Sequence, residues 1–232
     1  MKTRIYDDAC AANHAIDILG QRWVLAIIRE LVLGPKRFSD LRADLRDVSA
    51  NILSQKLELL ENRGLVVHHR LPPPALTPVY GLTRWGMEAA PILQAMARWG
   101  ARSPDHDMAR PMSATSFILS LRSMIDNRRA TGFAATIGFK LGRESFLVGY
   151  GSDGVMPQRA DPSLGKDCEA IVEGTPGAAM ALVHRKVPLQ ALEASGDLIV
   201  TGDRAIVRKL PLLYPPRERA IRPHSPPLSD MD

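Results

Sequence analysis

The chain has 232 residues, of which 45% are hydrophobic and 24% charged. This balance excludes wholesale disorder and leaves room for two ordinary domains. The longest uncharged runs are too short to cross a bilayer, and from the mixed charges at the N-terminus we expect no secretory leader. The only cysteines are Cys10 and Cys168. Two are too few for a disulfide framework, so we expect a reducing, cytoplasmic setting and no membrane partner.

The net charge of +5 is unevenly distributed. Residues 1–104 carry 14 Lys and Arg against 10 Asp and Glu, whereas residues 105–232 carry 16 against 15. The first segment is therefore the better partner for a polyanion such as nucleic acid, although the excess is modest.

Apolar periodicity and breakers predict the elements of the first hundred residues. Helices are expected over residues 11–19, 21–33, 38–45 and 50–63, the last capped by Ser49 and ended by Gly64. Two strands, 65–70 and 79–83, flank a stiff proline-rich loop. A longer helix over 84–101 should be kinked at Pro91.

Two short helices followed by two strands form the pattern of a winged helix-turn-helix, whose second helix enters the major groove of DNA. The helix over 50–63 turns amides and hydroxyls to one side and leucines to the other. Such a polar face suits the reading of base edges, but an ordinary solvated helix has the same composition. The expected DNA contacts are Asn51, Ser54 and Gln55 to bases, with Lys36, Arg37, Ser39, Ser49, Arg63, His68, His69 and Arg70 around them.

The run LGQRWVLAIIREL at residues 19–31 resembles the opening of HxlR-type winged-helix transcriptional regulators, which are MarR-like. The resemblance continues through GPKRFSDL, SANILSQKL, LENRGL and YGLT, and it spans residues 8–101. It implies a bacterial or archaeal homodimer on a pseudo-palindromic operator. The dimer contacts would come from the regions around residues 11–19 and 84–101.

Cys10 lies where some members of this family carry a cysteine that senses oxidants or electrophiles. Asp7 and Asp8 disfavour its thiolate, whereas a helix N-terminus beside it would favour the thiolate. The alternative is a small side chain that packs the first helix against a partner. For Cys168 we expect a structural role.

The winged-helix domain is predicted over residues 1–102. It is followed by a linker at 103–112, a second domain at 113–214 and a proline-rich tail at 215–232, which we expect to be disordered. Helices are predicted over 114–131, 175–184, 189–194 and 203–213. Strands are predicted over 133–141, 145–151, 155–159, 168–172 and 197–201. This order favours an α+β arrangement.

The second domain resembles the sterol-carrier-protein fold. The resemblance rests on the strands around Asp153-Gly154, the EGTPG break at 173–177 and the ending ASGDLIVTGD at 194–203. It implies an apolar tunnel for a lipid-like ligand, and the alternative is a closed core. The candidate lining residues are Phe117, Leu121, Phe139, Phe146, Val148, Met180 and Leu210.

No His, Cys and Asp spacing fits a metal site, and the chain has no glycine-rich phosphate loop or nucleophile elbow. We therefore expect no enzyme and no cofactor. The expected function is a homodimeric regulator that binds double-stranded DNA and is modulated by a small hydrophobic ligand in its second domain. The alternative is a carrier of lipids or other apolar ligands whose helical domain serves mainly for dimerisation.

Overall fold

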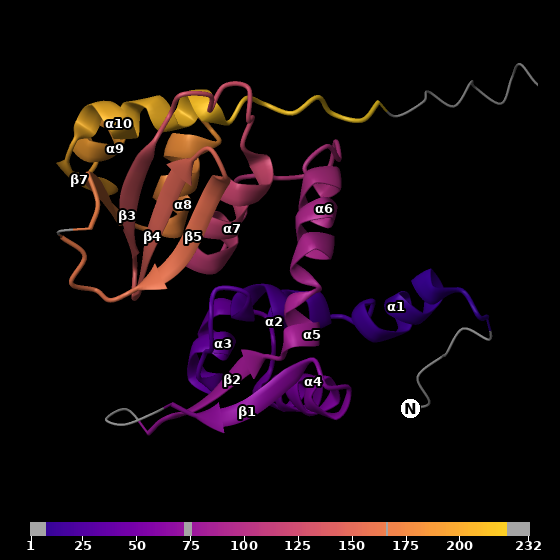
Figure 1. Ribbon diagram of the computed structural model, residues 1–232. Helices are drawn as coiled ribbons and strands as arrows, with labels where there is room; N and C mark the ends of the chain where they lie inside the picture. The colour runs from indigo at the N-terminus through magenta and orange to yellow at the C-terminus, as the bar shows by residue number, and fades with distance from the viewer. Residues whose placement is uncertain (1–7, 72–75, 166, 222–232) are drawn as a thin grey trace, which may run out of the picture.

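The computed structural model describes residues 8–71, 76–165 and 167–221. The buried apolar side chains form two separate hydrophobic cores, and Figure 1 shows the two parts of the chain side by side. One core takes its buried side chains from between Ile18 and Ala89, and the other takes them from between Ala114 and Tyr214. The molecule therefore has an N-terminal and a C-terminal half, each with its own core.

The N-terminal half contains six helices and a two-stranded antiparallel hairpin within its described residues. They are α1 (Ala11–Leu19), α2 (Val24–Leu31), α3 (Phe38–Asp44), α4 (Ala50–Asn62), β1 (Val66–Arg70), β2 (Pro78–Leu82), α5 (Arg84–Met87) and α6 (Ala90–Gly100). Helix α3, a short turn, α4 and the hairpin follow one another as the sequence predicts. The winged helix-turn-helix fold of this half is thus confirmed.

The ends of two predicted helices differ from the structure. Helix α2 begins only at Val24 because Trp23 has a left-handed backbone, with φ of 76°. The expected helix over 84–101 is two helices, and Pro91 lies in the first turn of α6, where its missing N–H costs nothing. In α5, a Cβ on Gly86 would lie 2.0 Å from the Leu65 carbonyl oxygen, so glycine lets this helix pack against the start of the hairpin.

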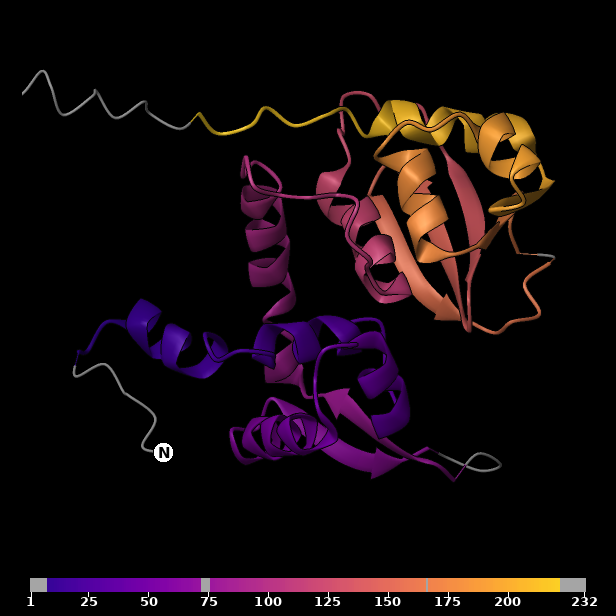
Figure 2. The same ribbon diagram turned by 180° about the vertical axis from the view of Figure 1, so that it is seen from behind.

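The C-terminal half is a five-stranded sheet in the order β5-β4-β3-β6-β7, with β3 and β6 parallel and the other neighbours antiparallel. Helices α7 and α8 cover one of its faces, in front of the sheet in Figure 2. The elements are α7 (Ala114–Met124), β3 (Ala135–Leu141), β4 (Glu144–Gly151), β5 (Gly154–Ala160), β6 (Ala170–Gly174), α8 (Pro176–Val183), α9 (Leu189–Ala194), β7 (Leu198–Gly202), α10 (Arg204–Lys209) and the 3₁₀ helix η1 (Leu210–Leu213).

The predicted helix over 114–131 ends early, at Met124, because Ile125 is extended and the amide of Asp126 donates to the Leu213 carbonyl oxygen at 2.9 Å. The structure describes only the first part of the expected tail, without helix or strand. Its first part, residues 215–221, runs beside the linker, where the Ala220 amide donates to the Arg102 carbonyl oxygen at 2.8 Å. Residues 222–232 and the loop residues 72–75 lie outside the described residues.

The predicted tunnel is corrected by the structure. Its seven candidate lining residues belong to the second core, and each is at most 5% exposed: Phe117, Leu121, Phe139, Phe146, Val148, Met180 and Leu210. Phe117 and Phe139, for example, meet edge to face with ring centres 5.7 Å apart. These side chains fill a closed core, which is the alternative that the sequence left open. Cys168 packs against β3, with its sulfur 3.1 Å from where a Cβ on Gly138 would lie.

Candidate nucleic-acid interface

Helix α4 is positioned by a cap and by a leucine face. The Ser49 hydroxyl oxygen accepts a hydrogen bond from the amide of Ile52 at 3.3 Å, which satisfies one of the free donors of the first turn. Leu53, Leu57 and Leu60 are buried in the N-terminal core. The helix is therefore fixed from behind, and its other face is free to meet a partner.

The exposed face of α4 carries the side chains predicted to read bases. Asn51, Ser54 and Gln55 are all exposed. The amide nitrogen of Gln55 donates to the amide oxygen of Asn51 at 3.3 Å, which orients both groups but uses only one donor and one acceptor. The structure thus brings these three residues together on one outward surface.

The residues around α4 are only partly placed as expected. Arg37, Ser39, His69 and Arg70 are exposed. His68 is also exposed, and its ring stacks on that of Tyr80 across the hairpin, with centres 4.5 Å apart. Arg63 is half-buried.

The guanidinium of Arg63 donates to the backbone oxygen of Asp17 at 3.0 Å, so it braces the end of α4 against α1. This position leaves less of its charge available to a phosphate.

The prediction of a phosphate contact for Lys36 is wrong. Its side chain is 2% exposed, and its Nζ lies 2.9 Å from Glu30 Oε2, 2.6 Å from Asp44 Oδ2 and 3.0 Å from Glu144 Oε1. An ammonium group enclosed by three carboxylates cannot reach the DNA backbone in this conformation. Lys36 instead joins the two halves of the molecule, because Glu144 belongs to the C-terminal half.

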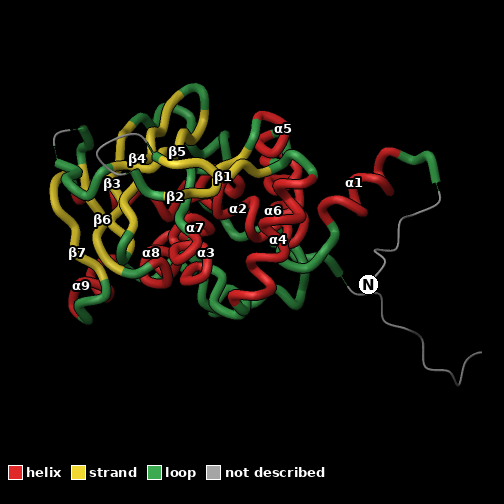
Figure 3. The backbone as a smooth tube through the Cα atoms, turned by 90° about the horizontal axis from the view of Figure 1, so that it is seen from below, coloured by secondary structure: helices red, strands yellow, loops and turns green. Residues whose placement is uncertain are grey.

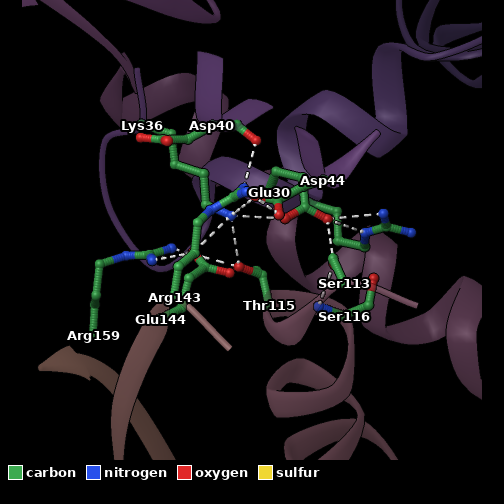
Figure 4. A network of polar contacts seen from close by, with 11 residues as sticks. Glu30, Lys36, Asp40, Asp44, Ser113, Thr115, Ser116, Arg143, Glu144 and Arg159 are labelled. Carbon is green, nitrogen blue, oxygen red and sulfur yellow. Dashed lines mark hydrogen bonds and ion pairs between the residues drawn. The ribbon is translucent and has the colours of Figure 1, made fainter. Parts of the chain in front are cut away.

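Figure 4 shows the polar network that surrounds Lys36. The Lys36 ammonium also donates to Thr115 Oγ1 of α7 at 3.0 Å, and the Ser113 hydroxyl donates to Glu30 at 2.7 Å. Burial lowers the pKa of Lys36, but the negative charges of Glu30, Glu144 and Asp44 outweigh it and leave that pKa above its usual value. The lysine is therefore charged at neutral pH.

The C-terminal half holds α3 near its end as well. The Arg143 guanidinium, from the turn between β3 and β4, lies 2.6 Å from Asp44 Oδ1 and donates to the Asp40 carbonyl oxygen at 2.9 Å. Arg159 of β5 pairs with Glu144. Lys36 precedes α3 and Asp44 is its last residue, so both ends of this helix are tied to the second half.

Cys10 is exposed and stands at the N-cap of α1. Hydrogen bonds from the backbone amides of Asn13 and Ala12 hold the pKa of the thiol below its usual value. In the single chain the thiol is open to solvent. The alternative, packing of the first helix against a partner, involves a second copy of the chain and stays a prediction.

Two further predictions concern metals and membranes. Among the described residues, no three His, Cys, Asp or Glu side chains are grouped so that they could hold a metal ion. Of the helices in the same part of the chain, none is both long and apolar enough to span a bilayer.

Comparison with known proteins places the N-terminal half among regulators. Residues 18–108 match the model of the family described as HxlR-like helix-turn-helix. YvaP of Bacillus subtilis (strain 168), an uncharacterized HTH-type transcriptional regulator, is 39% identical over 85 residues, which are 37% of this chain and 79% of YvaP. The HTH-type transcriptional regulator YodB of the same organism is 33% identical over 85 residues, 37% of this chain and 76% of YodB.

Among solved structures, a MarR-family protein from Porphyromonas gingivalis W83 is 26% identical and covers 42% of this chain and 95% of its own, with a TM-score of 0.38. The family model ends at residue 108, so the C-terminal half lies outside the match.

Proposed function

This chain belongs to the HxlR-like helix-turn-helix family of transcriptional regulators. We propose that it is a cytoplasmic homodimer that binds a pseudo-palindromic operator through α4 and through the wing, the hairpin of β1 and β2. The family is one of regulators and not of enzymes, which agrees with the sequence analysis. The observation that carries the proposal is the exposed face of Asn51, Ser54 and Gln55, backed by buried leucines. Two such helices, one per subunit, would enter successive major grooves.

The operator contact is tested by replacing Gln55 with alanine. We expect this change to weaken binding to the operator by about 1–3 kcal/mol, because the amide can bond two atoms of one base. Affinity for unrelated DNA should stay nearly unchanged. The measurement is a gel-shift titration with an operator selected from random DNA.

Two companion variants make the result specific. Arg37→Ala should weaken binding to all DNA alike and reduce the salt dependence by about one ion, because it removes a phosphate contact. Gln190→Ala removes another exposed amide, from α9, and should leave DNA binding unchanged. If Gln55→Ala behaved like Gln190→Ala, α4 would not be the reading helix.

The dimer is supported by apolar side chains that the single chain leaves in solvent. On α6, Ile92, Met96 and Trp99 recur at helical spacing, and Trp99 is 78% exposed. Helix α1 projects away from the rest of the described chain in Figure 3 and carries the exposed Ile16. Exposed apolar residues that cluster in this way mark a contact surface, and we assign it to a second copy of the chain.

Trp99→Glu should disrupt that dimer. Trp99 is the most exposed residue of the apolar stripe that Ile92, Met96 and Trp99 form on α6. A charge at this position is expected to cost about 2 kcal/mol or more of dimerisation free energy. Sedimentation of the variant at micromolar concentration should show monomers. Ile199→Glu, which puts the same charge on an exposed apolar position of β7, should remain dimeric. Equal dimerisation by both variants would refute the assignment of α6.

We further propose that residues 113–214 form a sterol-carrier-like domain, and the support is its five-stranded sheet with helices on one face. The alternative role as a lipid carrier finds no support in the seven residues expected to line a tunnel, because they fill the core. A role of Cys10 in redox sensing is likewise a proposal. Its support is the exposure of the thiol and its lowered pKa.

A further inference from the structure

Three arginines from separate segments line one hollow. In Figure 1, residues 215–221 pass the upper end of α6. They are Arg98 of α6, Arg122 of α7 and Arg217 of the C-terminal segment. Together they line a hollow of about 280 Å³. The other lining residues are Gln94, Ser123, Ile125, Asn127, Asp153, Gly154 and Val155.

The three arginines of this basic hollow form no ion pair with a described residue. Arg98 and Arg122 are exposed, and neither has an ion-pair or hydrogen-bond partner within the described part of the chain. The guanidinium of Arg217 donates from Nη2 to the Ser123 backbone oxygen at 3.3 Å, but its Nε is buried and bonds to no described residue. Asp153 supplies the one carboxylate among the lining residues. Arg217 thus keeps a donor without a described acceptor, and Arg98 and Arg122 offer all their donors, so the hollow suits an anionic group.

An apolar hollow adjoins the basic one. It measures about 620 Å³ and is lined by the rings of Phe133 and Tyr150, which meet edge to face with centres 5.4 Å apart. The rest of its lining is apolar at Ile125, Ala130 and Ala134 and polar at Asn127, Thr131, Ser152 and Asp153. The two hollows share four lining residues: Ile125, Asn127, Asp153 and Gly154. The basic and the apolar hollow are therefore continuous through these shared residues.

We propose that the two hollows together bind an amphipathic organic anion. A carboxylate or phosphate group would lie against Arg98, Arg122 and Arg217, because guanidinium groups bind either anion through paired hydrogen bonds. A flat apolar body would lie beside Phe133 and Tyr150. This site replaces the predicted tunnel as the place where the second half takes a ligand, and it draws residues from both halves of the molecule.

The site also connects the ligand to the proposed dimer. At 100° per residue, Gln94 and Arg98 face about 150° away from the stripe of Ile92, Met96 and Trp99 on α6. An anion bound by Arg98 together with Arg122 and Arg217 would therefore link α6 to the C-terminal half, on the side of α6 opposite the dimer surface. Any effect on operator affinity follows from this position and rests on the proposed function.

The test uses three probes with the same apolar body: 2-naphthoate, 2-naphthyl phosphate and 2-naphthol. Calorimetric titration of the full chain should show binding of at least one of the two anions, and that anion identifies the head group. The neutral naphthol should bind at least tenfold more weakly. The double variant Arg98→Gln/Arg122→Gln should weaken the anion by about tenfold or more, because each lost pair contributes a charge-assisted hydrogen bond.

The control variant is Arg208→Gln, which removes an exposed arginine of α10 and should bind like the natural chain. Ala134→Trp, which fills the apolar hollow from its rim, should weaken the anion without changing the charge. The proposal is overturned if neither anion binds, if naphthol binds equally well, or if the double variant matches Arg208→Gln. These titrations contain no DNA, so their outcome is separate from that of the operator test.

Discussion

Replacing Lys36 with methionine should lower the free energy of unfolding by about 3–5 kcal/mol. The change removes the ammonium that lies within 3.0 Å of Glu30, Asp44 and Glu144. Glu30 and Glu144 are buried. Without Lys36, Glu30 would keep its ion pair with Arg29, and Glu144 its ion pair with Arg159. Urea unfolding at pH 7, followed by circular dichroism, measures the loss.

Arg37→Met is the matched control for this prediction. Arg37 is the next residue and is exposed, so the same loss of a positive charge should change the stability by less than about 0.5 kcal/mol. If Lys36→Met cost less than about 1 kcal/mol, the ammonium would not be held between the halves as described.

The position of Lys36 gives this network a consequence for DNA binding. Its backbone pairs with Tyr80 of β2, and its side chain reaches Thr115 of α7 and Glu144 of β4. The wing, the start of α3 and the second half therefore meet at one residue. Any arrangement that separated Lys36 from Glu30 and Glu144 would leave buried charges unpaired, which is costly. The second half thus fixes the position of the helix that precedes α4.

The parts of the interface that the sequence predicted are those governed by local rules. The spacing of Leu53, Leu57 and Leu60 orients α4, and Ser49 caps it. Gly64 ends the helix with φ of 69°, a conformation that favours glycine. Each of these depends on neighbours within a few residues, so periodicity and residue type were sufficient.

The network around Lys36 depends on contacts distant in sequence, which no local pattern shows. A lysine next to an arginine at the start of a helix looks like any solvated pair, and Glu144 lies more than a hundred residues away. One signal was present. Glu30 interrupts the apolar face formed by Ile27, Ile28 and Leu31, and a carboxylate among such neighbours needs a partner. No comparable sequence signal indicated the basic hollow, because its three arginines come from separate segments and interrupt no apolar face.

Phe117→Ala should destabilise the chain by about 3–5 kcal/mol. Phe117 is fully buried and packs against the rings of Phe139 and His184, at 5.7 Å and 6.3 Å between centres. In a closed core the deleted ring leaves a cavity, and the lost contacts are not replaced. In a ligand tunnel the same deletion would widen a space that already exists. The measurement is again the free energy of unfolding in urea.

The control is Leu212→Ala, which shortens an exposed apolar side chain in η1 of the same half and should cost less than about 0.5 kcal/mol. A loss near 1 kcal/mol for Phe117→Ala, together with tighter binding of an apolar probe by the variant, would favour a ligand tunnel over a closed core. The closed core predicts the larger loss. It also predicts that 2-naphthoate, bound outside this core, keeps its affinity in every Phe117→Ala molecule that remains folded, because Phe117 lines neither hollow.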